Sequence, residues 1–222
     1  MTANRRPLRS RQTGWAQTLA TLLARRRISP DSISAASLVF AALGCAALML
    51  WPSQTGLARV AILLAAAVLI QLRLLANLLD GLVAVEHGLG RTAGPIWNEL
   101  PDRIADVLFF LGAGYGARFA GVGWAADLGW LTAVLALLAP YVRELGRGLG
   151  MAADFSGPGA KPHRMTALTL TCALSAAAAI SWATAPGLIM SAGLAVISAL
   201  TATTIVRRTL HLARWLAARS ET

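Results

Sequence analysis

Five of the ten acidic residues in this chain fall between positions 77 and 106, where the sequence is NLLDGLVAVEHGLGRTAGPIWNELPDRIAD. They are Asp80, Glu86, Glu99, Asp102 and Asp106. Carboxylates that lie close together in a low-dielectric region cannot all stay ionised without a cation. Oxygen ligands of this kind suit Mg²⁺ or Mn²⁺, usually together with substrate phosphates. The stretch therefore predicts a divalent-metal site, of the kind that stabilises the attacking and leaving oxygens in phosphoryl displacement.

The spacing of the polar residues places them on two helix faces. Asn77 and Asp80 are three apart, and Gly81 and Ala84 continue the same turns. If the second half is helical, its polar residues fall within an arc of roughly 100°. The full set of candidate metal ligands is Asn77, Asp80, Asn98, Glu99, Asp102 and Asp106. The alternative is structural salt bridging to the arginines nearby, namely Arg73, Arg91, Arg103, Arg143 and Arg147.

The composition indicates a membrane protein. The chain has 222 residues, 56% hydrophobic and only 14% charged, whereas soluble domains carry about 25% charged residues. Its apolar residues form long runs, which is typical of transmembrane helices. The net charge of +10 therefore favours a membrane surface as partner, and no nucleic acid. Cys45 and Cys172 each lie within an apolar run and are interpreted as small core residues.

We expect an all-α integral membrane protein with six transmembrane helices. Residues 1–28 form a basic N-terminal segment, whose positions 13–27 predict an amphipathic helix that lies at the membrane interface or docks on its neighbours. The membrane domain covers 29–206, and a basic tail covers 207–222. A Ser-Pro-Asp sequence at 29–31 signals the first helix start. The spans are expected at about 31–51, 57–85, 101–120, 124–142, 164–184 and 188–206.

The distribution of positive charge sets the expected orientation. Of the 20 Lys and Arg residues, only Arg59 and Arg118 fall near one face, and Arg73 lies within a span. All the others lie in the termini or beside the loops after the second and fourth spans. By the positive-inside rule, these regions and the acidic stretch are cytoplasmic. Both termini are therefore expected in the cytoplasm.

At this point the residues resemble a known signature. The CDP-alcohol phosphotransferase family has the pattern DxxDGxxAR, eight residues, then GxxxDxxxD. Asp80, Gly81 and Ala84 match it, the eight-residue spacer reaches Gly94, and the last aspartate falls on Asp102. The resemblance extends to the ISPDSIS start and the six-span layout, so it covers nearly the whole chain.

Three positions depart from the signature. Asn77 and Asn98 stand where the family has aspartates, and Val85 stands where it has arginine. Amide oxygens can still coordinate Mg²⁺, and neighbouring acids (Glu99, Asp106 and, less directly, Glu86) can restore some of the charge. We therefore expect an active enzyme with a rearranged metal site. The opposing hypothesis is a site that has lost metal and activity.

The resemblance implies a reaction and roles for the matching residues. A phosphatidyl group would move from a CDP-linked donor such as CDP-diacylglycerol to an acceptor alcohol, with release of CMP, in phospholipid biosynthesis. Asp102 would be the catalytic base or a metal ligand, with Mg²⁺ or Mn²⁺ as cofactor. The nucleotide would be bound by Asp80, Gly81, Ala84 and Gly94. The resemblance also implies a homodimer in a cell membrane, such as the bacterial inner membrane, with the site facing the cytoplasm.

A second group of residues on the same side is basic. It consists of Arg143, Arg147, Lys161 and Arg164. In the family, basic residues here resemble a pocket for the phosphate of the acceptor, and Arg suits bidentate phosphate recognition. The alternatives are ordinary positive-inside charge and contact with anionic lipids.

Two alternatives belong to other functional classes. One is a non-catalytic membrane protein that keeps the fold and binds a CDP-lipid or a partner. The other is a transporter, which would place its ionisable residues near mid-membrane along several spans. The acids of this chain gather at one interface, which disfavours transport. The sequence does not name the acceptor alcohol.

Overall fold

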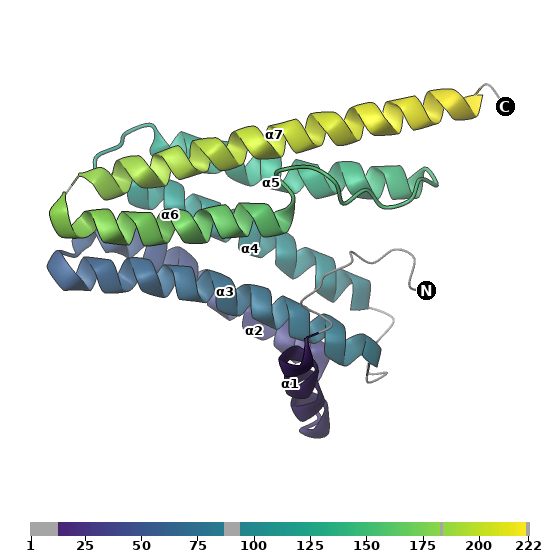
Figure 1. Cartoon of the computed structure of the whole chain (residues 1–222), viewed down its shortest axis with the longest axis horizontal. Helices are drawn as coiled ribbons and strands as arrows, with labels where there is room; N and C mark the ends of the chain where they lie inside the picture. The colour runs from purple at the N-terminus through teal and green to yellow at the C-terminus, as the bar shows by residue number, and fades with distance from the viewer. Residues whose placement is uncertain (1–12, 87–93, 183, 221–222) are drawn as a thin grey trace.

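The computed structural model describes residues 13–86, 94–182 and 184–220, and all the regular secondary structure within them is helical. The long helices run side by side, with the short helix α1 across one end (Figure 1). The elements are α1 (Gly14–Arg25), α2 (Pro30–Leu50), the 3₁₀ turn η2 (Trp51–Ser53), α3 (Gly56–Glu86), α4 (Gly94–Phe119), α5 (Ala125–Gly148), α6 (Lys161–Ser181) and α7 (Ala185–Ser220).

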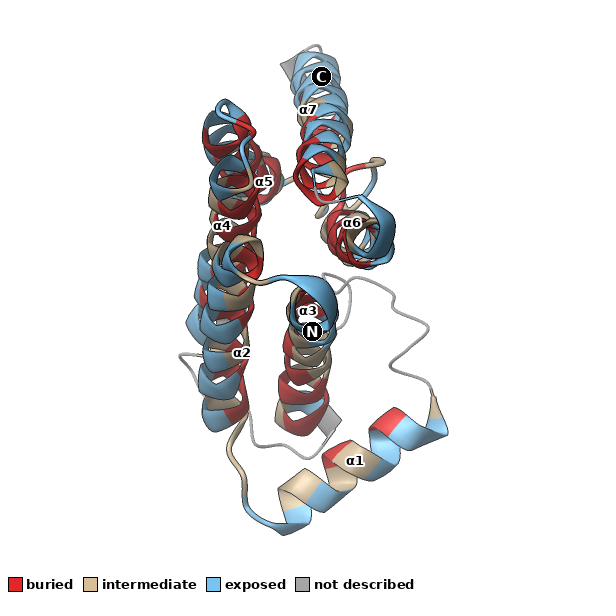
Figure 2. Ribbon diagram, turned by 90° about the vertical axis from the view of Figure 1, so that its left-hand side faces the viewer, coloured by how far each residue is buried: buried red, intermediate tan, exposed pale blue. Residues whose placement is uncertain are grey.

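The six long helices form two rows. Viewed end on, α2, α4 and α5 make one row and α3, α6 and α7 the other (Figure 2). Neighbouring helices pack against one another within each row, and contacts of α2 with α3 and of α5 with α7 join the rows. The core between them is apolar and includes Trp51, Phe109, Phe110 and Met165, all fully buried.

The outer faces are apolar as well, which is expected of a protein surrounded by lipid. Leu57, Ile180 and Trp182 expose 84%, 73% and 72% of their surface. Five helices in the described residues are long and apolar enough to span a membrane: α2, α3, α5, α6 and α7. The acids and prolines in the first half of α4 lower its hydropathy, although α4 packs between α2 and α5. Six spans and cytoplasmic termini therefore stay predictions.

Helix α1 docks on the bundle by one face. Ala16 and Ala20 are fully buried, in a cluster with residues of α2 and α3. Trp15 and Leu22 remain about half exposed. Because an exposed tryptophan and leucine suit the membrane interface, docking on neighbours and an interfacial position are compatible.

The helix termini follow the expected signals in most places. The Ser29 hydroxyl accepts a hydrogen bond from the Ser32 amide at 3.1 Å, capping α2 immediately before Pro30. Between α4 and α5, Gly121 has a φ of +98°, a conformation that glycine adopts without strain.

One predicted boundary is wrong. The third span was expected to start at Pro101, after a loop from 86 to 100, but α4 begins at Gly94 and Pro101 lies inside it. Proline removes one backbone hydrogen bond, yet packing against neighbouring helices can keep such a helix continuous. The consequence is that Glu99, Asp102 and Asp106 occupy one helix.

Two other helices are longer than expected. Helix α5 continues to Gly148, and α7 continues through the basic tail to Ser220. The bundle therefore extends beyond its apolar part at the end that carries the acidic residues.

Glycines bring the helices of one row into close contact. A Cβ on Gly116 of α4 would lie 1.9 Å from the backbone oxygen of Leu48 in α2. Gly114 of α4 and Gly129 of α5 likewise face each other, with no room for side chains. Small residues permit this approach between membrane helices, so they fix α4, and with it the acidic residues, against α2 and α5.

Candidate functional site

Helix α3 places Arg73, Asn77 and Asp80 on one face, because they are spaced four and three apart. Asp80 is only 5% exposed, and the Ser34 hydroxyl of α2 donates to its Oδ2 at 2.7 Å. Its Oδ1 is buried without a hydrogen-bond partner among the described residues. Asn77 is half-buried. This face therefore offers one carboxylate oxygen to which no described side chain donates a hydrogen bond.

Helix α4 turns Asp102 toward two cations. Its Oδ1 is ion-paired with the Arg73 guanidinium of α3, and its Oδ2 with the Lys161 ammonium of α6. The Arg73 side chain is fully buried, and those of Asp102 and Lys161 are 11% and 16% exposed. Three helices from both rows thus meet at one carboxylate.

One turn further along α4, Asp106 forms a separate buried pair. Arg164 donates to Asp106 Oδ2 at 2.7 Å, and both side chains are almost completely buried. Arg164 also donates to the Gly159 carbonyl at 2.9 Å. The pair therefore joins α4 to the start of α6 and to the connection that precedes it.

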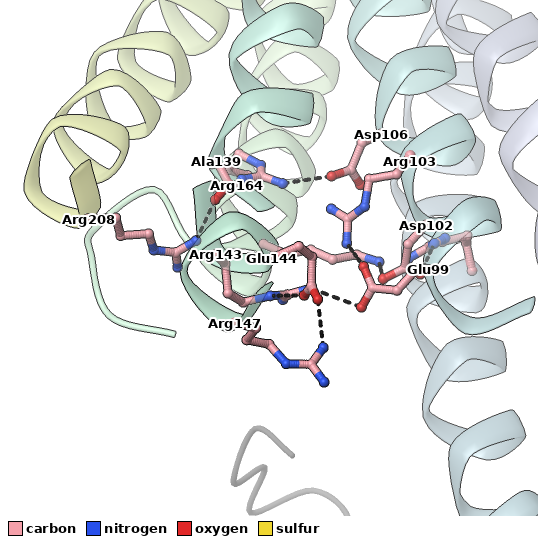
Figure 3. Close-up of polar contacts among 12 residues, drawn as sticks. Glu99, Asp102, Arg103, Asp106, Ala139, Arg143, Glu144, Arg147, Arg164 and Arg208 are labelled. Carbon is pink, nitrogen blue, oxygen red and sulfur yellow. Dashed lines mark hydrogen bonds and ion pairs between the residues drawn. The ribbon is translucent and has the colours of Figure 1, made fainter. Parts of the chain in front are cut away.

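Glu99 of α4 belongs to a partly exposed network of charges. It accepts from Arg103 at 2.5 Å and from Arg143 of α5 at 2.9 Å. Arg143 and Arg147 also contact Glu144, at 2.8 and 2.6 Å. Figure 3 shows this network together with the buried pair described above. The network therefore ties the start of α4 to the end of α5.

The connection between α5 and α6 is tied to α7. Arg208 donates to the Ser156 carbonyl and to the Ala139 carbonyl of α5, at 2.9–3.0 Å. Asp154 accepts from the Ser156 amide at 2.8 Å and contacts His211 at 3.1 Å. Burial opposes ionisation of Asp154, but the hydrogen bonds from Ser156 and His211 outweigh it and lower its pKa.

The structure brings some of the predicted metal ligands together and separates others. Asp80 and Asp102 are near enough for their charges to interact, whereas Glu99 and Asp106 have arginine partners of their own. The side chains of Glu86 and Asn98 lie outside the described residues. The ligand assignment, including the catalytic role of Asp102, stays a prediction.

The predicted nucleotide-binding residues lie at the same end of the bundle. Gly81 and Ala84 are half-buried on α3 beyond Asp80, and Gly94 is the first residue of α4. A Cβ on Gly94 would meet no atom within 4 Å of the described structure. Their binding of a nucleotide stays a prediction.

The predicted acceptor-phosphate residues all have carboxylate partners. Arg143 and Arg147 contact Glu144, Lys161 contacts Asp102, and Arg164 contacts Asp106. A hollow of about 630 Å³ lies at the end of α5 and is lined by Glu144, Arg147, Gly148, Gly150, Met151 and Ala152. It is open to solvent and includes only Arg147 of the four cations.

Sequence reasoning missed two contributors to the site. Ser34 donates a hydrogen bond to Asp80. The only feature of the sequence that could have indicated this role is its position, as a small polar residue near the start of an apolar helix. Arg73 stands out in the sequence as a lone arginine within a span, but its pairing with Asp102 was only one of several alternatives. Its spacing of seven residues from Asp80, two helical turns, was the available signal.

The donor set fits one divalent ion better than two. Among the described side chains, no group of three or more His, Cys, Asp or Glu residues could hold a metal ion. The unpartnered Oδ1 of Asp80 is a suitable hard ligand, and Asn77 one turn earlier could add an amide oxygen. Both oxygens of Asp102, by contrast, already face cations.

Comparisons with known proteins locate the fold. No family model and no curated protein matches the sequence. Three crystal structures of phosphatidylinositol phosphate synthase from Mycobacterium tuberculosis do match the structure. The form with CDP-DAG bound has a TM-score of 0.72 at 22% identity, covering 89% of this chain and 92% of that one.

The other two structures agree with the first. The complex with manganese and citrate has a TM-score of 0.70 at 23% identity, covering 89% of this chain and 88% of that one. The apo form has a TM-score of 0.66 at 22% identity, covering 88% and 94%. The chain therefore shares the fold of this phosphatidylinositol phosphate synthase. The synthase is a member of the CDP-alcohol phosphotransferase family.

Proposed function

We propose that this chain transfers a phosphatidyl group from a CDP-linked lipid, such as CDP-diacylglycerol, to an acceptor alcohol in phospholipid biosynthesis. The observation that carries the proposal is the coincidence of fold and signature. The fold covers nearly the whole chain, and the matching residues Asp80, Gly81 and Asp102 lie at one end of it. The solved synthase with this fold holds CDP-DAG in one structure and manganese in another.

The proposed reaction is a displacement at phosphorus. The acceptor hydroxyl oxygen forms a bond to the β-phosphorus of the donor, and the bond from that phosphorus to the CMP oxygen breaks. The hydroxyl proton passes to a base, for which Asp102 is the candidate. An ionised carboxylate is the form that can accept a proton. Arg73 and Lys161 stabilise that form of Asp102, and they also reduce its affinity for a proton.

A divalent ion held by Asp80 and Asn77 would neutralise charge on the diphosphate. Mg²⁺ and Mn²⁺ suit the same oxygen ligands, so either is proposed. The Ser34 hydroxyl donates a hydrogen bond to Asp80, and Lys161 neutralises Asp102.

The acceptor site is proposed at the junction of α5 and α6. Arg143 and Arg147 are the candidate cations there, and their carboxylate partners are partly exposed. Exposed ion pairs are weak, so a phosphate group could displace Glu144 from them. Arg164 is buried in its pair with Asp106 and suits this task less well.

A second candidate function is CDP-lipid binding without catalysis. The observation that favours it is the pair of asparagines, Asn77 and Asn98, at two signature aspartate positions. Binding without catalysis is also compatible with the ion pairs of Asp102, whose two oxygens each contact a side-chain cation.

One assay separates the two candidates. Purified protein is given CDP-diacylglycerol, Mg²⁺ or Mn²⁺ and a panel of acceptors, and CMP release is followed. The panel contains glycerol 3-phosphate, serine, inositol phosphate, glycerol and choline. We expect CMP release with one of them. Folded protein that retains CDP-diacylglycerol but releases no CMP with any acceptor would support the binding function instead.

A further inference from the structure

The contact that distinguishes this site is the double ion pair at Asp102. The carboxylate has a cation at each oxygen, and the two cations come from different helices, α3 and α6. Lys161 is also within electrostatic reach of Asp106 and Arg73. Asp102 is therefore held at the point where the two helix rows meet.

The positive side chains around Asp102 already neutralise its charge, so a metal ion is not needed there for that purpose. The two neighbouring carboxylates, Asp80 and Asp102, carry two negative charges when ionised, and Arg73 and Lys161 carry two positive ones. One divalent ion can bind at the unpartnered oxygen of Asp80. A second ion at Asp102 would have to displace Arg73 or Lys161, and would then repel the displaced cation. Asp106 Oδ1 is also unpartnered, but Arg164 already neutralises that carboxylate.

Burial makes that displacement costly. The Arg73 side chain is fully buried, and removing one partner from a buried ion pair leaves an uncompensated charge. The Nε and Nη1 atoms of Arg73 have no hydrogen-bond partner among the described residues, so Asp102 is its main compensation. The Lys161 side chain is slightly more exposed, but its ammonium nitrogen is buried, so displacing it also removes compensation from a buried charge.

We propose that Arg73 and Lys161 take the place of a second divalent ion at Asp102, so that the chain binds at most one. Arg73 is a positioning residue that holds Asp102. Lys161 neutralises the same carboxylate from α6. This metal count does not rest on the proposed function.

The test is a titration with Mn²⁺ without substrate, in which free Mn²⁺ is measured by electron paramagnetic resonance. We expect no more than one bound ion per wild-type chain. Lys161→Gln should gain a further ion, or bind Mn²⁺ at least tenfold more tightly, because one oxygen of Asp102 becomes free. Lys161→Arg keeps the charge and should keep the wild-type count.

The matched control is Arg207→Gln, which removes one positive charge from an exposed position on α7. It should titrate like wild type. Two ions in the wild-type chain would overturn the proposal, and so would a Lys161→Gln titration that coincides with that of Arg207→Gln. Thermal unfolding of each variant checks that it is folded. Because no turnover is measured, a failure here is distinguishable from failure of the proposed transferase function.

Discussion

The buried pair of Asp106 and Arg164 gives the sharpest stability prediction. Both residues were candidates for ligand binding, Asp106 as a metal ligand and Arg164 as a phosphate ligand. Their mutual contact at 2.7 Å, with almost no exposed surface, favours a role in holding the bundle together instead. Replacing one partner leaves the other charge buried without compensation.

The expected magnitude follows from that burial. Asp106→Leu should lower the free energy of unfolding by about 3–5 kcal/mol, the range for removing one partner of a buried ion pair. For a domain of this size, that corresponds to a fall in Tm of about 6–20 °C. Replacing both residues, with Asp106→Leu and Arg164→Met, should recover part of the loss. About 1–3 kcal/mol should remain, because the Gly159 carbonyl still lacks its donor.

The assay is thermal unfolding of the purified protein in detergent, followed by tryptophan fluorescence. The two single variants and the double variant form a mutant cycle, which isolates the pair. Additive losses in the double variant would refute the reasoning. So would an Arg164→Met variant of unchanged stability that no longer binds substrate, since that result would assign Arg164 to the ligand.

Three further predictions follow from the packing and from the Asp154 contacts. Gly116→Ala should destabilise the chain by about 1–3 kcal/mol or more through overpacking, because its Cβ would meet the Leu48 carbonyl, whereas Gly123→Ala meets no atom and should leave Tm unchanged. Ser34→Ala should lower the free energy of unfolding by about 1–3 kcal/mol, because it leaves the buried Asp80 carboxylate without its hydroxyl donor. The control variant Thr203→Ala, at an exposed position, should leave stability unchanged. Equal Tm values for the two variants would contradict the role given to Ser34. The pKa of Asp154 is lowered in the folded state, so its stabilising contribution is present above the unfolded pKa and lost as pH falls through the folded one. The Tm difference between wild type and Asp154→Asn should therefore be constant near neutral pH and shrink below about pH 4, and a difference that grows on acidification would contradict it.

Most of the helices could be predicted from the sequence because apolar runs and turn residues are local signals. The start of α2 at Pro30 is an example, since Ser29 caps it as expected. The start of α4 could not be predicted in the same way. Polar residues and Pro101 favoured a loop before 101, but packing against neighbouring helices keeps the segment helical from Gly94.

The side-chain partners in the site were harder to predict. Spacing placed Asn77 and Asp80 on one face, and it placed Asp102 and Asp106 on another. Which cation each acid meets depends on how α3, α4 and α6 are rotated against one another. Asp106 and Arg164 are 58 residues apart, and no local pattern relates them.

Retention of CDP-diacylglycerol tests most directly the claim that this site binds a CDP-linked lipid, which the transferase proposal requires, and native mass spectrometry of the purified chain measures it. We expect one CDP-diacylglycerol per chain, displaced by CMP but not by AMP. Gly81→Leu should abolish retention by filling the proposed nucleotide site, while Gly123→Ala should not. Absence of bound CDP-diacylglycerol from folded wild-type protein, or equal retention by Gly81→Leu, would contradict the proposal.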